Sequence, residues 1–160
     1  MPEFVDQVSL AHNWFGLRSP DLFSGFQNCP NPNERFGVPC NLIGYAYPYE
    51  GASYAGVGTA NAERPITLGL HHGECLTQKL KKKLRSGAKY RFSFQTIQSD
   101  TSLGYFENAI VIFSRDDPKT LLDWQYNLLH AKHSQYFPFV TDTLNWQKAE
   151  YTFTAGGGEQ

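Results

Sequence analysis

Two segments in the second half of this chain alternate apolar and polar residues with a period of two, and this alternation limits what the chain can fold into. Residues 88–98 place one set of side chains on a single face: Tyr90, Phe92, Phe94 and Thr96. Residues 146–155 repeat the pattern with Ala149, Tyr151, Phe153 and Ala155. Successive side chains of a strand point to opposite faces, so this spacing predicts two half-buried strands. We expect four of these rings to be buried between two sheets: Phe92, Phe94, Tyr151 and Phe153.

Turn residues and apolar runs indicate further elements. Residues 105–114 are apolar on both faces near their end, which is typical of a central strand. Residues 75–84 have leucines at a spacing that suits a strand or a helix. The strand is favoured because Gly73 and a turn at 86–87 bracket a segment of strand length. Two short strands are predicted at 41–47 and 53–60, a long ordered loop at 19–39, and a helix at 121–132.

The composition supports a turn-rich all-β fold. The 160 residues include 14 Gly, 9 Pro and one Met, and 15% of them are aromatic. This mixture is typical of β proteins with many turns. Six to eight short strands, with no repeat or interior linker, predict a single domain over residues 1–160. We expect an antiparallel β-sandwich of the jelly-roll type with one short helix in a loop. No stretch approaches the about 20 apolar residues of a membrane-spanning helix, so no membrane insertion is expected.

Charge and cysteine content restrict the partners but leave the compartment open. Lys and Arg number 14 against 15 Asp and Glu, and the net charge of −1 argues against nucleic acid or an anionic membrane as the main partner. The basic run at 79–85 is interpreted as the solvated face of an edge strand. Three cysteines leave at least one outside any bridge within the chain. Cys29 and Cys40 are either bridged to each other or unpaired core residues.

One cluster has the chemistry of a metal site. Residues 71–75 are His-His-Gly-Glu-Cys, and imidazole, carboxylate and thiolate groups all bind metals. Strand neighbours point to opposite faces, so His71 and His72 reach one ion only in a loop. The alternative is a polar loop with a buried Cys75. His130 and His133 form a second, weaker pair. Sequence motifs of hydrolases, dinucleotide-binding enzymes and P-loop enzymes are absent. We expect no cofactor, with a structural calcium ion as the open alternative.

Aromatic side chains in predicted loops are candidate ligand contacts. Four rings lie in or beside such loops: Trp14, Tyr47, Tyr49 and Trp124. The faces of these rings cover the apolar C–H patches of a sugar, and planar polar groups bind its hydroxyls. The polar candidates are Asp21, Asn41 and Arg91. The alternative is that the rings fill the core of a domain that is poor in methionine.

The order of short motifs along the chain resembles a known family. The motifs are Asn13-Trp14-Phe15, Ser19-Pro20-Asp21-Leu22-Phe23, Gly37-Val38-Pro39-Cys40-Asn41, EGASYAG at 50–56, L-x-x-G-x-x-Y-R-F-S-F at 84–94 and AGGGE at 155–159. Their order is similar to the galactose-binding-like jelly-roll module of secreted and cell-surface proteins of Bacteroidetes. The family usually has one strand before this part and further strands after it. The resemblance therefore implies either a trimmed module, whose exposed sheet edge can contact another chain or domain, or a domain that closes differently.

The resemblance implies a binding module that acts outside the cytoplasm, extracellular or at the cell surface. Together with the loop-borne rings it predicts a non-catalytic carbohydrate-binding module. Two alternatives stay open. One is a structural or adhesive spacer domain with the same fold. The other is a small polysaccharide-active or metal-dependent enzyme that uses His71, His72 and Cys75.

Overall fold

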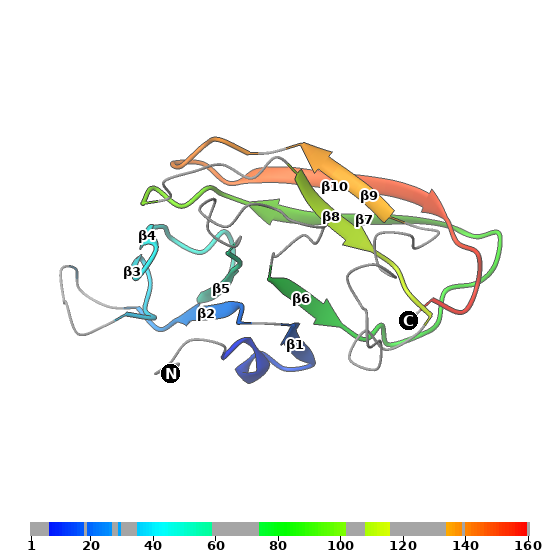
Figure 1. Ribbon diagram of the computed structural model, residues 1–160, viewed down its shortest axis with the longest axis horizontal. Helices are drawn as coiled ribbons and strands as arrows, with labels where there is room; N and C mark the ends of the chain where they lie inside the picture. The colour runs from blue at the N-terminus through cyan, green and yellow to red at the C-terminus, as the bar shows by residue number, and fades with distance from the viewer. Residues whose placement is uncertain are drawn as a thin grey trace, which may run out of the picture.

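Almost all of the regular secondary structure that the computed structural model describes is strand (Figure 1). The described residues are 7–17, 19–26, 29, 35–58, 74–101, 108–115, 134–138 and 140–159, with the backbone alone described at 108–110 and 134–138. Within these ranges one 3-10 turn, η1 (Val8–Leu10), accompanies the strands, and all pairs of named strands are antiparallel. The prediction of an all-β chain is confirmed. In the same ranges no helix is long and apolar enough to cross a membrane.

The two alternating segments form the longest ladder of the described chain. Strands β7 (Lys89–Thr96) and β10 (Gln147–Thr154) pair along all eight residues, with Phe92 opposite Tyr151 and Tyr90 opposite Phe153. At about 3.4 Å per residue this ladder is about 25 Å long, and it runs along one long side of the molecule (Figure 1). Both strand predictions are confirmed.

The rings on one face of this ladder pack against Phe113. Phe113 stacks on Phe153 with ring centroids 4.4 Å apart and contacts Phe92 edge-to-face at 5.6 Å. Phe153 is buried as predicted, whereas Phe92, Phe94 and Tyr151 are only half-buried. In the described part of the chain each of these two strands has a single hydrogen-bonded neighbour.

Strands β8 (Asn108–Ile112) and β9 (Ser134–Pro138) form a second antiparallel pair. The strand predicted at 105–114 is therefore present over its apolar centre. No strand is predicted at 134–138, where Ser-Gln-Tyr-Phe-Pro shows no alternation. β9 forms there because β8 supplies its ladder partners. The helix predicted at 121–132 lies outside the described residues.

Two further pairs lie on the other side of the molecule from the β7–β10 ladder (Figure 1). Strand β1 (Trp14–Leu17) pairs with β6 (Cys75–Gln78), and β2 (Asp21–Ser24) pairs with β5 (Ser53–Gly56). β5 confirms the strand predicted at 53–60 over its first four residues.

One prediction for these segments is wrong, and another holds only over its first four residues. The loop predicted at 19–39 contains β2, because Leu22 and Phe23 are buried and their burial outweighs the turn-forming residues around them. The strand predicted at 75–84 ends at Gln78. Beyond that residue the backbone bends, and the Leu84 N–H donates to the Glu159 carbonyl at 2.9 Å instead of to a neighbouring strand.

The single strand predicted at 41–47 is instead a tight hairpin of β3 (Cys40–Asn41) and β4 (Gly44–Tyr45). Gly44 has a φ of +132°, a backbone conformation that other residues rarely adopt, and the chain reverses there. The Asn41 side-chain oxygen accepts the N–H of Ile43 at 3.1 Å and supports the reversal.

A small core and a disulfide lie beside this hairpin. Phe23, Phe36 and Val38 are buried together, and Ile43 and Tyr54 pack against them. The disulfide joins Cys29 to Cys40, with Cα atoms 5.9 Å apart, and closes the loop that contains Phe36 and Val38. Of the two states that the sequence leaves open for these cysteines, the bridged one is present.

Candidate ligand-binding groove

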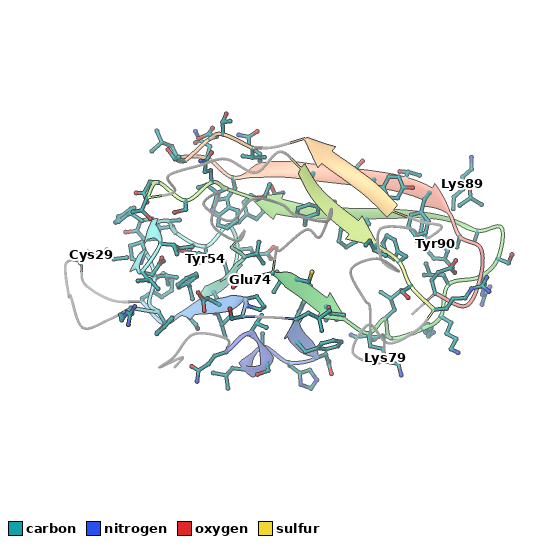
Figure 2. All side chains as sticks on the ribbon, viewed as in Figure 1. Cys29, Tyr54, Glu74, Lys79, Lys89 and Tyr90 are labelled. Atoms are coloured by element: carbon teal, nitrogen blue, oxygen red, sulfur yellow. A yellow bond between two sulfur atoms is a disulfide. The ribbon has the colours of Figure 1, made fainter. Side chains whose placement is uncertain are left out.

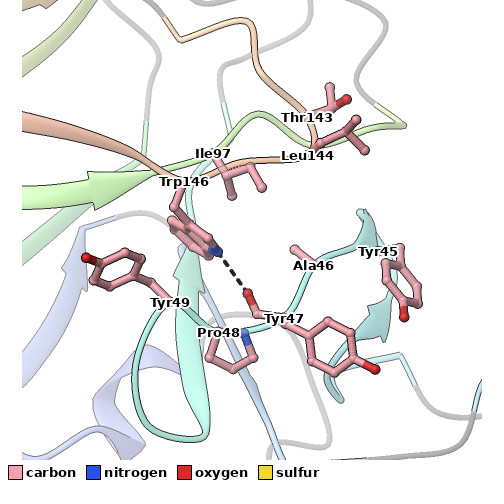
Figure 3. Close-up of a pocket in the computed structure, with 9 residues that line it drawn as sticks. All are labelled: Tyr45, Ala46, Tyr47, Pro48, Tyr49, Ile97, Thr143, Leu144 and Trp146. Carbon is pink, nitrogen blue, oxygen red and sulfur yellow. Dashed lines mark hydrogen bonds between the residues drawn. The ribbon is translucent and has the colours of Figure 1, made fainter.

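A groove of about 300 Å³ opens beside the β3–β4 hairpin (Figure 3). One wall is the segment 45–49, and the other is the loop 143–146 that leads into β10, with Ile97, which directly follows β7, beside that loop. The lining residues are Tyr45, Ala46, Tyr47, Pro48, Tyr49, Ile97, Thr143, Leu144 and Trp146. We call 45–49 the tyrosine wall.

The tyrosine wall is held by the segment that follows β7. The Ile43 carbonyl accepts a hydrogen bond from Thr101 Oγ1 at 2.8 Å, and Asp100 Oδ1 accepts the backbone N–H of Tyr45 at 3.2 Å. A Cβ atom on Gly44 would overlap this carboxylate and would lie 2.8 Å from Asp100 Cγ. Glycine at this position therefore allows the carboxylate to reach the wall.

Asp142 shapes the facing loop. Its carboxylate accepts the backbone N–H groups of Leu144 and Asn145, each at 2.8 Å. It also accepts the side-chain amides of Asn145 at 3.1 Å and Gln147 at 3.3 Å. The hydrogen bond from the Leu144 N–H, followed by those from Asn145, lowers the pKa of Asp142. The loop 143–146 is thus ordered by the carboxylate of Asp142, the residue directly before it.

A hydrogen bond joins the two walls. Trp146 Nε1 donates to the Tyr47 carbonyl at 2.8 Å (Figure 3). The same indole contacts the Tyr54 ring edge-to-face at 5.6 Å, and Tyr54 in turn packs on Phe23 of the core. Burial raises the pKa of Tyr54, whose hydroxyl accepts a hydrogen bond from Asn41 Nδ2 at 2.5 Å. Continuous contacts therefore connect the groove to the core.

Three tyrosine rings of this wall are open to solvent. Tyr45, Tyr47 and Tyr49 are 52%, 58% and 59% exposed, and Leu144 on the facing loop is 85% exposed. Tyr45 and Tyr47 contact edge-to-face with ring centroids 5.7 Å apart. A hydrogen bond to the Tyr47 side chain raises the pKa of Tyr45. The groove therefore presents ring faces next to phenol hydroxyls.

The structure brings together two of the ligand contacts predicted from the sequence and separates the others. Tyr47 and Tyr49 line the groove. Trp14 is 38% exposed on β1 and does not line it. Asp21 lies half-buried on β2, opposite Gly56.

Asn41 and Arg91 also lie outside the groove lining. The Asn41 side chain donates to Tyr54 and to the Gly37 carbonyl, so it supports the hairpin. Arg91 is exposed on β7, five residues before Thr96. That separation places it about 17 Å along the strand from the groove end.

The candidate metal ligands are only partly described. The four candidate histidines lie outside the described residues: His71, His72, His130 and His133. The candidate sugar contact Trp124 lies outside them as well. Cys75 is half-buried on β6, opposite Leu17. Glu74 of the same cluster accepts hydrogen bonds from Ser19 Oγ at 2.8 Å and from the Gly58 N–H at 2.6 Å. Where the structure describes the chain, no group of three or more His, Cys, Asp or Glu side chains is placed to hold a metal ion.

The sequence does not predict seven of the nine groove residues as ligand contacts, among them Tyr45, Leu144 and Trp146. Trp146 opens an alternating segment and is therefore assigned to a strand. The signal that points to the loop is Asp-Thr-Leu-Asn at 142–145, a turn in which an aspartate accepts the N–H groups that follow it. A tryptophan directly after such a turn lies at the end of its strand, where loops meet.

The lining and size of the groove suit a small uncharged ligand. None of the nine lining residues is charged, and the volume is at the lower end of the range for small-molecule sites. No protein-family model matches the chain, and no curated protein or solved structure matches it. What the chain binds is therefore inferred from its surface.

Proposed function

We propose that this chain is a non-catalytic carbohydrate-binding module whose ligand lies in the groove between the tyrosine wall and the loop 143–146. The observation that carries the proposal is the exposure of three neighbouring tyrosines on a wall that hydrogen bonds hold in place. Large aromatic side chains are usually buried, because exposing their apolar area to water costs free energy. An ordered cluster of exposed rings is typical of a surface that a ligand covers.

A neutral sugar has the chemistry that this groove complements. A pyranose has apolar C–H groups on its faces and hydroxyls around its rim. Tyr47 and Tyr49 offer ring faces to the former and phenol hydroxyls to the latter, and Thr143 adds a hydroxyl on the facing loop. The absence of charged side chains from the lining favours a neutral sugar over an acidic one.

The disulfide supports a location outside the cytoplasm. Bridges such as Cys29–Cys40 form and persist in oxidising compartments, and they are rare where cellular reductants keep thiols reduced. The bridge closes the loop that contributes Phe36 and Val38 to the core. It therefore stabilises the core against which Ile43, just before the tyrosine wall, packs. We infer an extracellular or cell-surface protein.

The arrangement of the strands supports a β-sandwich of the jelly-roll type, the fold implied by the resemblance to galactose-binding-like modules. The β1–β6 and β2–β5 pairs lie on the opposite side of the molecule from the β7–β10 ladder (Figure 1). In such sandwiches the loops gather at the ends of the sheets, which is where a groove built from loops would form. An experimental structure that shows two packed sheets would test this part of the proposal.

The test is a glycan-array screen of the purified chain, followed by titration calorimetry with the sugars that bind. We expect dissociation constants from millimolar to micromolar, or about −4 to −8 kcal/mol. Tyr49→Ala should weaken binding by about 1–3 kcal/mol, by analogy with base stacking on aromatic rings. It should leave Tm nearly unchanged, because the ring is more than half exposed. Trp14→Ala is the matched control, since it removes an exposed ring outside the groove and should leave binding unchanged.

Three results would contradict the proposal. If no saccharide binds at millimolar concentration, a structural or adhesive spacer becomes the better assignment. If Trp14→Ala weakens binding as much as Tyr49→Ala does, the sugar does not lie in the groove. If the chain cleaves the polysaccharides that it binds, it is an enzyme.

A further inference from the structure

Half of the positive charges in this chain lie in one short stretch. Seven of the 14 lysines and arginines fall between residues 79 and 91, and no Asp or Glu lies between residues 75 and 99. The net charge of −1 therefore conceals a strongly basic segment. Six of its exposed cations, which we call the basic end, are Lys79, Lys81, Lys82, Lys83, Arg85 and Lys89. Figure 2 shows Lys79 and Lys89 toward the same end of the molecule.

The structure removes the simplest structural reason for these lysines. A row of lysines on an edge strand discourages pairing with another sheet, and the sequence predicts that role here. Strand β6, however, ends at Gln78, and residues 79–88 form no strand. Within the described residues no ion pair neutralises the basic end, since the pair that is present joins Lys148 and Glu150. The five cations at 79–85 lie on no strand, and none of the six joins that pair.

The second half of the basic end, from Leu84 on, is held by the segment that follows β10. The Leu84 N–H donates to the Glu159 carbonyl at 2.9 Å, and the Gly87 N–H donates to the Ala155 carbonyl at 2.9 Å. Lys81, Lys82 and Lys83 are exposed neighbours along the chain, with no acidic residue between 75 and 99 to offset their charge. Their like charges repel one another, and a bound anion would relieve that repulsion.

We propose that the basic end binds an anionic polysaccharide that carries sulfate or carboxylate groups. Lysine is a compact, hydrated point charge that suits such groups, and short basic runs are typical of heparin-like sites. Single-stranded nucleic acid is bound with the help of exposed stacking rings, and membrane surfaces with apolar anchors. Neither feature is present in 79–89, where the exposed residues are the six cations, Ser86 and Gly87, and the neighbouring Tyr90 is half-buried. This site is independent of the neutral-sugar groove.

The proposal is tested by measuring binding of the full chain to heparin and to dextran sulfate. The variant Lys81→Gln/Lys82→Gln/Lys83→Gln should weaken binding roughly 100-fold at low salt, because each lysine near a dense anionic surface contributes about fivefold. The affinity of the parent chain should fall steeply as salt is added, and that dependence should become shallower in the variant. Lys148→Gln is the matched control and should bind like the parent. The triple lysine-to-arginine variant should also retain binding.

Four outcomes would overturn the proposal. The first is no binding to either sulfated polymer. The second is a triple glutamine variant that binds like the parent while circular dichroism shows it folded. The third is stronger binding to polyuridylate, phosphatidylserine vesicles or polyglutamate at matched charge, because the partner would then be of another class. The fourth is loss of heparin binding in Tyr49→Ala, which would place the anion in the groove. Failure of the neutral-sugar screen alone leaves this prediction intact.

Discussion

Replacing Gly44 with alanine should loosen the tyrosine wall, and the geometry sets the size of the effect. With a φ of +132°, an alanine here is strained, at a cost of about 1–3 kcal/mol. Its Cβ would also overlap the Asp100 carboxylate. Asp100 is exposed and can rotate away, but it then releases the N–H of Tyr45, whose hydrogen bond contributes about 0.5–1.5 kcal/mol. The expected loss in the free energy of unfolding is about 1.5–4.5 kcal/mol.

Thermal unfolding followed by circular dichroism measures this loss, since each kcal/mol lowers Tm by about 2–4 °C in a chain of this size. Gly51→Ala is the matched control, because Gly51 also has a positive φ, of +71°, but no atom lies within 4 Å of the added Cβ. Strain alone should then cost about 1–2 kcal/mol. Asp100→Ala should cost only the hydrogen bond. The double variant Gly44→Ala/Asp100→Ala should match Gly44→Ala, because both have already lost that bond.

Equal losses of stability in Gly44→Ala and Gly51→Ala would contradict this prediction. So would losses of Gly44→Ala and Asp100→Ala that add in the double variant. Either result would mean that the carboxylate does not hold the wall. Sugar binding gives a second measurement. If the tyrosine wall is displaced in Gly44→Ala, this variant should bind sugar more weakly than its fraction of unfolded chain alone would explain.

Three further predictions concern stability. Because hydrogen bonds lower the folded-state pKa of Asp142, its stabilising effect is present above the unfolded pKa of about 3.9 and is lost as the pH falls through the folded pKa. Tm measured against pH should therefore fall more steeply below about pH 4 in the parent than in Asp142→Asn, and parallel curves would contradict this. Phe153→Ala should cost about 3–5 kcal/mol in urea unfolding, and Phe94→Ala less because that ring is half-buried; equal losses would count against the packing described. Replacing Cys29 and Cys40 with serine should cost about 3 kcal/mol, from the 11-residue separation of the bridge, and an unchanged Tm would show that the bridge adds nothing.

The strands that sequence reasoning predicted best are those whose pattern is complete within one segment. Strands β7 and β10 alternate over eight residues each, so their register with the core follows from local spacing. β2 was missed because only two of its four residues are buried and the surrounding residues favour turns. The hairpin at 40–45 was missed because it depends on one glycine whose φ is not visible in the pattern.

The groove was only half predictable for the same reason. Tyr47 and Tyr49 flank a turn and are apolar enough to be noticed there, so they could be singled out as exposed rings. The hydrogen-bond partner of Tyr47 could not be predicted, because Trp146 lies 99 residues away along the chain and is close to the Tyr47 carbonyl only when the chain is folded. Asn41 has the residue type of a ligand contact, but its hydrogen bonds hold the hairpin.

Four properties follow from the amino-acid sequence alone: the all-β class, the two long strands, the cluster of tyrosines near one turn and the concentration of lysines at 79–85. These properties depend on residues that are neighbours along the chain. Three others follow only from the folded chain: where β6 ends, which segments form the two walls of the groove and why the lysines at 79–83 lie off any strand. Each of these depends on hydrogen bonds between distant segments, such as Leu84 to Glu159 and Trp146 to Tyr47. Because such bonds form only when the whole chain is folded, no local pattern encodes them.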